Sequence, residues 1–168
     1  FLADLSECYT KTLQDLDVSF DSIYGPAYKG IFLASIIGAS LGKSDLDIPV
    51  SFNRKEEKDH GEGGDIIGQL PSGNVLIVDD VISAGTAARE SIEKIKSIGA
   101  NPKVMLVGLD RQEKGSSEIS AKAELENDFG LTVSSIVNLD LLISFVSDDP
   151  NFKEFKSDLE EYRSNWGA

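Results

Sequence analysis

The stretch that decides the fold is Val75-Leu-Ile-Val-Asp-Asp-Val-Ile-Ser-Ala-Gly-Thr-Ala87, in which an apolar run leads into two acids and then into small residues. A run that is apolar at every position, as residues 75–78 are, is typical of a strand covered on both faces. Asp79 and Asp80 follow where we expect that strand to end, and a helix is predicted at residues 85–98. Ligands of open α/β sheets bind beyond the carboxyl ends of the strands, and the free N–H groups that begin a helix suit a phosphate. The stretch therefore predicts a phosphate site, the alternative being that the two acids only turn and cap the chain.

Strand-like and helix-like segments alternate on both sides of this stretch. Strands are predicted at residues 20–24, 48–52, 104–109 and 133–137, and helices at residues 29–41, 119–129, 139–146 and 150–163. The last helix has Asp149 as its expected N-cap and Pro150 as its first residue. Strands joined by helix-length crossovers form a mainly parallel sheet with helices on both faces. We therefore expect a single α/β domain over residues 1–168, with a central sheet of about five strands.

Composition narrows the possible partners and compartments. The formal net charge of −13 argues against nucleic acid as the main partner, because binding it needs a basic surface. The longest apolar run, at about residues 30–42, is shorter than the ~20 residues of a membrane span, and no signal peptide is visible. A lone cysteine, Cys8, excludes an internal disulfide and fits a reducing compartment. We expect a cytoplasmic protein without membrane or nucleic-acid contacts.

A long polar stretch interrupts the alternation. Residues 53–64 read Asn-Arg-Lys-Glu-Glu-Lys-Asp-His-Gly-Glu-Gly-Gly and include no apolar side chain. A stretch with nothing to bury inside a compact domain is usually a functional loop or a disordered one. Its three cations oppose four acids, so charge alone would make it a solvated turn rather than an anion site.

The stretch at residues 75–87 resembles the phosphoribosyl pyrophosphate signature of the type I phosphoribosyltransferases. The resemblance implies the fold of that family and a role for Asp79 and Asp80 at the ribose hydroxyls. It also implies that the loop at residues 84–87 wraps the 5-phosphate. The remaining signature positions, also expected to bind this substrate, are Val81, Ile82, Ser83, Ala84, Gly85, Thr86 and Ala87.

Three further segments resemble the orotate phosphoribosyltransferases within that family. Residues 25–30, Gly-Pro-Ala-Tyr-Lys-Gly, resemble the loop whose lysine contacts pyrophosphate, which implies binding positions at Tyr28 and Lys29. Residues 52–64 resemble the mobile catalytic loop almost residue for residue. Residues 109–113, Leu-Asp-Arg-Gln-Glu, resemble the segment whose arginine, here Arg111, pairs with the carboxylate of orotate. Ser83 stands where threonine is usual and keeps the hydroxyl that contacts orotate. The catalytic loop supplies the pyrophosphate-handling positions Arg54, Lys55, Lys58 and His60.

The resemblance implies the reaction of orotate with phosphoribosyl pyrophosphate to give orotidine 5′-phosphate and pyrophosphate, a step of UMP synthesis. Lys58, His60, Asp79 and Asp80 would be the catalytic residues. Mg²⁺ would be the cofactor, held through the pyrophosphate and water and not directly by the protein. A homodimer would be the functional unit, with the loop at residues 53–64 shared across its interface.

One departure from the family concerns the start of the chain. The sequence opens with Phe1 in the middle of a helical pattern, and the family's N-terminal segment, which carries a lysine and two aromatics facing the base, has no counterpart. We therefore expect an N-terminally incomplete domain. Three alternatives remain: an inert fragment, a purine-salvage enzyme, and a regulator that binds the sugar phosphate and nucleic acid. Arg111 disfavours the purine enzyme, since purine bases have no carboxylate, and the acidic charge disfavours the regulator.

Overall fold

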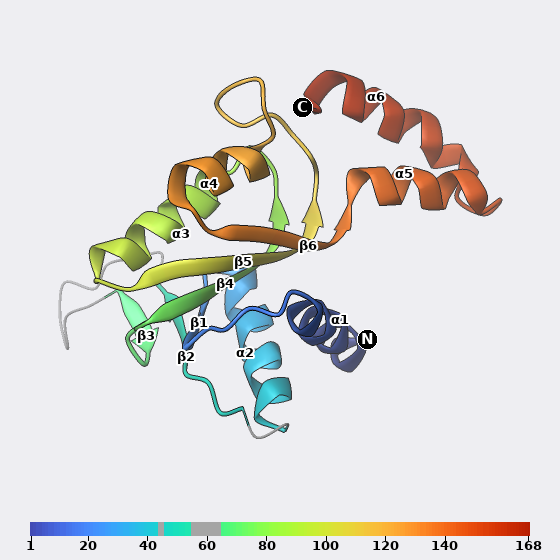
Figure 1. Cartoon of the computed structure of the whole chain (residues 1–168). Helices are drawn as coiled ribbons and strands as arrows, with labels where there is room; N and C mark the ends of the chain where they lie inside the picture. The colour runs from blue at the N-terminus through green and yellow to red at the C-terminus, as the bar shows by residue number, and fades with distance from the viewer. Residues whose placement is uncertain (44–45, 55–64) are drawn as a thin grey trace.

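The fold is a twisted six-stranded sheet between two layers of helices (Figure 1), seen in a computed structural model that describes residues 1–43, 46–54 and 65–168. The strand order is β3-β2-β1-β4-β5-β6, and every neighbouring pair is parallel except β2 and β3. The strands are β1 (Ser22–Gly25), β2 (Val50–Asn53), β3 (Ile66–Gly68), β4 (Asn74–Ile82), β5 (Asn101–Asp110) and β6 (Thr132–Asn138).

Helices cover both faces of the sheet. On one face lie α1 (Leu2–Asp15) and α2 (Lys29–Gly42), and on the other lie α3 (Thr86–Ser97) and α4 (Ala121–Phe129). The remaining helices, α5 (Leu139–Asp148), the 3-10 turn η1 (Lys153–Phe155) and α6 (Lys156–Trp166), follow β6 and pack on one another. No helix of the described residues is long and apolar enough to cross a membrane.

The apolar run of β4 explains the two layers, because its side chains alternate between two cores. Val75 and Ile77 are buried with α3 and α4, whereas Leu76 and Val78 are buried with α1 and α2. All four side chains are fully buried. Successive side chains of a strand point to opposite faces, so a strand that is apolar throughout needs a helix layer on each face.

The predicted architecture is confirmed, and several element boundaries differ from the prediction. β4 runs on to Ile82, so Asp79 and Asp80 lie inside the strand and not beyond its end. β3 is a sixth strand that we did not predict, and it pairs antiparallel with β2. It has only three residues, too few for periodicity to reveal. The other predicted strands and helices lie within a few residues of their expected places.

The predicted helix at residues 150–163 was wrong in its start. The α-helix begins at Lys156, after the turn η1. Asp149 caps a tight turn instead of a helix: its Oδ1 accepts from the Asn151 N–H at 2.9 Å, and its carbonyl accepts from the Phe152 N–H at 3.1 Å. An Asp side chain that binds a backbone N–H two residues ahead forms such a turn as readily as it caps a helix.

Candidate active site

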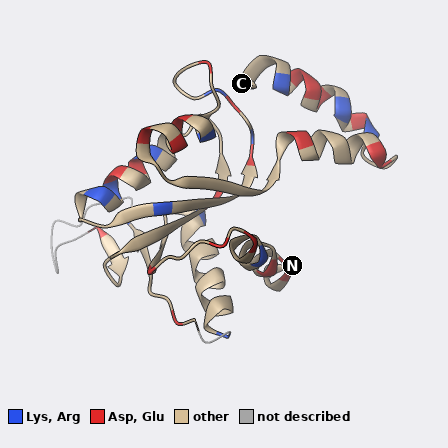
Figure 2. Cartoon of the chain, in the orientation of Figure 1, with Lys and Arg blue, Asp and Glu red and all other residues tan. Residues whose placement is uncertain are grey.

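The carboxyl halves of β4 and β5 contain acidic residues, whereas the rest of the sheet has almost no charged residue. Figure 2 shows the Lys, Arg, Asp and Glu residues mainly on helices and loops. The strands carry only Asp79, Asp80, Lys103 and Asp110. Burial raises the pKa of Asp79 from 3.8 to about 6, and the neighbouring Asp80 carboxylate adds to the rise. Two adjacent acids that follow an apolar run on one strand, one of them with a raised pKa, make this place a candidate ligand site.

Lys29 neutralises one of the two acids. Its Nζ lies 2.5 Å from Oδ2 of Asp80, and the Lys29 side chain is 72% exposed. The hydrogen bond to Asp80 raises the pKa of Lys29, while the positive charge of Arg111 opposes the rise. Lys29, Asp80 and Arg111 are therefore neighbours, although they come from α2, β4 and the segment after β5.

Two glycines bring the Lys29 loop onto β4. A Cβ at Gly25 would lie 2.1 Å from the carbonyl oxygen of Gly30, and a Cβ at Gly30 would lie 2.8 Å from the carbonyl oxygen of Val78. The loop between them is also tied to β2, because the Ala27 N–H donates to Oδ1 of Asn53 at 2.8 Å. Only residues without a side chain fit at this approach, which explains the Gly-x-x-x-x-Gly spacing of residues 25–30.

The loop from β4 to α3 presents an uncapped helix start. Gly85 takes the left-handed conformation at φ 84°, and no side chain caps the helix that begins at Thr86. The first turn of α3 has no acidic residue. Its N–H groups are thus free for an anion at the positive end of the helix dipole. Ala84, Thr86 and Ala87 are exposed around this helix start.

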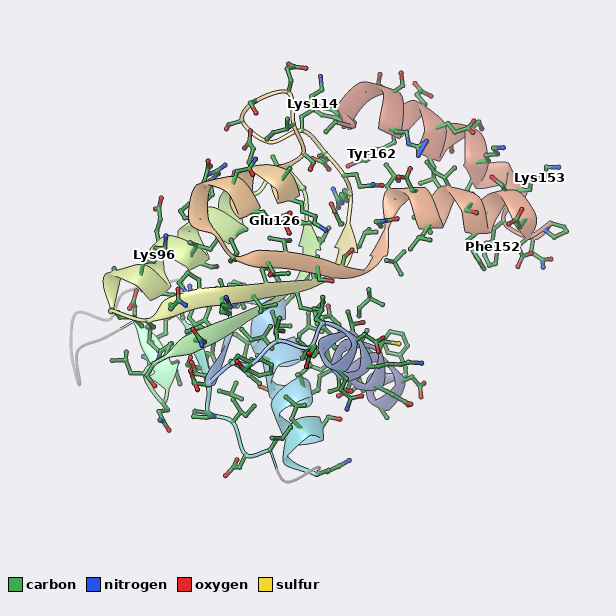
Figure 3. All side chains as sticks on the ribbon, in the orientation of Figure 1. Lys96, Lys114, Glu126, Phe152, Lys153 and Tyr162 are labelled. Atoms are coloured by element: carbon green, nitrogen blue, oxygen red, sulfur yellow. The ribbon has the colours of Figure 1, made fainter. Side chains whose placement is uncertain are left out.

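Arg111 follows β5 and is held by the C-terminal helix. Its backbone N–H donates to the carbonyl of Ile82 at 3.1 Å, which places it beside the end of β4. Its Nη1 lies 3.5 Å from both the Tyr162 hydroxyl and Oε1 of Glu113. Tyr162, labelled in Figure 3 on the inner side of α6, also donates to Glu113. These contacts raise the pKa of Arg111, chiefly through the hydrogen bond to Tyr162, and fix one end of its guanidinium.

A cavity of about 470 Å³ opens beside Asp79 and the start of α3. Asp79 and Arg54 line it, together with Ala27 from the Lys29 loop and Ala87 from the start of α3. Lys94 of α3 also lines the cavity, and its ammonium forms an ion pair with the Asp65 carboxylate. The backbone carbonyl of Asp65 accepts from the Arg54 N–H at 2.7 Å. The cavity therefore lies between Asp79, the start of α3, and Asn53 and Arg54 at the end of β2.

The structure brings together most of the predicted site residues at one edge of the sheet: Tyr28, Lys29, Arg54, Asp79, Asp80, residues 81–87 and Arg111. Lys55, Lys58 and His60 lie outside the described residues. Among the residues that are described, no group of three or more His, Cys, Asp or Glu side chains could hold a metal ion.

Comparison with known proteins gives the family of this chain. The phosphoribosyl transferase domain family matches residues 1–126. The orotate phosphoribosyltransferase of Marinobacter nauticus is 46% identical over 167 residues, which are 99% of this chain and 79% of that protein. This chain belongs to the orotate phosphoribosyltransferase family. A crystal structure of the Francisella tularensis orotate phosphoribosyltransferase superposes with a TM-score of 0.79 at 34% identity, covering 99% of this chain and 80% of that one. The Leishmania donovani UMP synthase superposes with a TM-score of 0.76 at 27% identity, covering 98% of this chain and 33% of that one.

Three residues that support this candidate site were missed in the sequence. Tyr9 of α1 donates its hydroxyl to the carbonyl of Asp79 at 2.9 Å. Asn53 and Tyr162 hold the Lys29 loop and Arg111, as described above. Tyr9 lies in the helical period of apolar residues at the start of the chain, so the pattern indicated only a core position. Nothing in the local sequence of Tyr162, at 51 residues from Arg111, indicates the contact.

Proposed function

We propose that this chain transfers the 5-phosphoribosyl group from phosphoribosyl pyrophosphate to orotate through the site at the ends of β4 and β5. The observation that carries the proposal is the Lys29–Asp80 pair, 2.5 Å apart, beside an uncapped helix start in a chain of this family. A cation, an acid pair and free backbone N–H groups are the three partners that pyrophosphate, ribose and a 5-phosphate require.

Substrate binding would exchange the partner of Lys29. In the structure its ammonium is bound to the Asp80 carboxylate. The pyrophosphate would take over the ammonium and leave Asp80 free to accept hydrogen bonds from the ribose hydroxyls. The 5-phosphate would lie on the N–H groups at Gly85, Thr86 and Ala87, since an anion is stabilised at a helix start. The two ends of the substrate would then be held by different elements, which fixes the anomeric carbon between them.

Orotate would be oriented by Arg111. Tyr162 and Glu113 occupy one nitrogen of its guanidinium, and the remaining N–H donors suit a planar carboxylate. As the bond from the anomeric carbon to pyrophosphate breaks, positive charge develops on the ribose and negative charge on the leaving oxygens. Asp79 and Asp80 would stabilise the first charge, while Lys29 and Arg54 would stabilise the second.

The donor set at this site fits Mg²⁺. This ion is usually held by one or two carboxylates together with phosphate oxygens and water, so it does not need a cluster of protein ligands. Asp79 and Asp80 provide two carboxylates on β4, beside the Lys29 ammonium that the pyrophosphate would take. When bound, the ion would neutralise charge on the leaving pyrophosphate, and the two acids would contact its water shell.

A homodimer is part of the proposal, with residues 53–64 serving the partner's site. The support is the resemblance of these residues to the family's catalytic loop, which gives Lys55, Lys58 and His60 roles at the pyrophosphate. Mixing a Lys58→Ala chain with an Asp80→Asn chain, each nearly inactive alone, tests the sharing. One site of each heterodimer would have both a sound loop and a sound Asp80, so activity should return. If verified subunit exchange restores nothing, the loop serves its own subunit.

The central experiment is a turnover assay with orotate, phosphoribosyl pyrophosphate and Mg²⁺, following orotidine 5′-phosphate and pyrophosphate together. We expect the unmodified chain to form both products. The turnover rate of Asp80→Asn should be lower by at least about a hundredfold, which is the effect of losing one charge-assisted contact in a transition state. Asp47→Asn is the matched control, since it removes the same charge from an exposed position before β2, at the amino ends of the parallel strands and so opposite the site. Equal loss in both variants, or product formed with adenine in place of orotate, would refute the assignment.

A further inference from the structure

Tyr9 is a buried tyrosine whose hydroxyl, the one polar atom of its side chain, lies against the backbone of the acid pair Asp79 and Asp80. It lies on α1, in the core shared with α2, and is 1% exposed. Its hydroxyl donates to the carbonyl oxygen of Asp79 at 2.9 Å. The ring thus packs as an apolar core residue while its tip ends at the floor of the site.

The bond from Tyr9 completes a clamp on one peptide group. The peptide that joins Asp79 to Asp80 has its carbonyl held by Tyr9 and its N–H held by Oδ1 of Asp79, at 2.9 Å. Rotation of this peptide plane would move the Asp80 N–H that holds the Asp79 carboxylate, and it would change the backbone dihedral angles on both sides of the peptide. The bond from Tyr9 therefore supports the Asp79 carboxylate through the Asp80 N–H, and it holds the backbone from which the Asp80 side chain projects.

The opposite wall of the clamp is Gly108 of β5. A Cβ at this position would lie 2.9 Å from the Tyr9 hydroxyl oxygen and 2.9 Å from the carbonyl oxygen of Asp80. A side chain here would displace either the tyrosine or the strand. Burial, with the Asp80 and Asp79 carboxylates nearby, raises the pKa of Tyr9 above its ordinary value, so the hydroxyl keeps its proton as a donor.

We propose that Tyr9 is a positioning residue for ribose recognition, which holds Asp79 and Asp80 in the orientation that the sugar hydroxyls require. The inference rests on the proposed function, in which the two acids bind the ribose. It assigns to α1 a role in the site, although the helix contributes no group that would touch the substrate.

Binding of ribose 5-phosphate, 2-deoxyribose 5-phosphate and inorganic phosphate to the whole chain, measured by calorimetry or NMR titration, tests this role. Tyr9→Phe removes one oxygen atom and leaves the ring in the core. We expect it to weaken ribose 5-phosphate about fivefold, the effect of one lost hydrogen bond. The loss for 2-deoxyribose 5-phosphate should be smaller, and inorganic phosphate should bind as before, because it needs only the start of α3.

Ser6→Ala is the matched control, since Ser6 lies on the same helix and donates to the carbonyl of Ile36 at 3.1 Å, away from the acids. It should lower the melting temperature as Tyr9→Phe does, with no change in ribose 5-phosphate binding. Gly108→Ala disturbs the clamp from its other side and should give the same ribose-selective loss if Tyr9→Phe folds poorly.

Two results distinguish a failure of this inference from a failure of the proposed function. Equal weakening of all three ligands by Tyr9→Phe, or no weakening at all, would overturn the positioning role while Asp80→Asn still weakens ribose 5-phosphate. If Asp80→Asn itself binds ribose 5-phosphate like the parent, the acid pair does not bind the sugar and the proposed site is wrong.

Discussion

Replacing Asp79 by Asn should stabilise the fold and weaken the site at the same time. Burial raises the pKa of Asp79 from 3.8 to about 6. A carboxyl group with a raised folded-state pKa adds stability that is complete below the unfolded value and is lost as the pH rises through the folded one. At neutral pH the ionised Asp79 is therefore a cost to the fold. Asn removes the charge, and its Oδ1 can still accept the bond that the Asp80 N–H now donates.

The size of this effect follows from the shift of the pKa. A pKa difference of one corresponds to about 1.4 kcal/mol, so the rise of the Asp79 pKa from 3.8 to about 6 sets an upper limit of ~3 kcal/mol. Asp79 lines an open cavity and is only partly buried, and solvent screens part of the interaction. We expect Asp79→Asn to raise the free energy of unfolding by about 1–2 kcal/mol at pH 8, and by less at pH 5.

Urea unfolding at pH 5 and at pH 8 measures this difference directly. Glu93→Gln, an exposed position on α3, is the control, because any loss of one negative charge relieves a chain whose net charge is −13. An equal gain in both variants, or a gain for Asp79→Asn that does not grow with pH, would refute the argument from burial. Phosphoribosyl pyrophosphate should bind more weakly to the stabilised variant.

Three other predictions concern the two ends of the site and its support. Thr86→Ile should abolish phosphoribosyl pyrophosphate binding in calorimetry, because its side chain fills the space over the start of α3, while circular dichroism stays unchanged; tight binding would show that the phosphate lies elsewhere. Tyr162→Phe should raise KM for orotate about threefold to tenfold and leave KM for phosphoribosyl pyrophosphate unchanged, because Glu113, released from Tyr162, competes with orotate for Arg111; equal changes in both constants would contradict this. Hydrogen bonds from Ser117 and Ser116 lower the pKa of Glu124 from 4.5 to about 2. The ionised Glu124 therefore contributes stability that is present above pH 4.5 and is lost as the pH falls toward 2. Glu124→Gln should flatten the dependence of the urea midpoint on pH over that range.

The sheet could be predicted from the sequence because the residues of β4 indicate what covers the two faces of the strand. Four consecutive apolar residues, Val75–Val78, require a helix layer on each face, and the neighbouring helices have clear periods and glycine ends, such as Gly99 and Gly130. The phosphate loop and Lys29 could be predicted for a similar reason, since each lies within a short contiguous motif. Local patterns thus gave the elements and the groups that those elements carry.

Contacts between distant segments could not be predicted in this way. Tyr9 and Asp79 are 70 residues apart, and the bond between them depends on how α1 crosses β4 and β5. Tyr162 reaches Arg111 only because α6 returns to the segment after β5, where the Lys114 N–H donates to the carbonyl of Trp166 at 3.0 Å. The end of β4 was misplaced because acids are rare in strands, whereas pairing with β5 continues as far as Ile82 and Asp110.

The continuation of β4 through both acids has a consequence for inhibitors. Carboxylates on a strand that is paired with β5 through this stretch and held from α1 by Tyr9 cannot adapt to a ligand without bending the sheet, so the sugar site keeps one shape. A rigid ring whose hydroxyls already match that shape would lose little conformational entropy on binding and would force no rearrangement of the protein. A flexible sugar mimic of equal polarity would have to be ordered first. Compounds for this site should therefore gain affinity from a locked ring more than from added hydrogen-bonding groups.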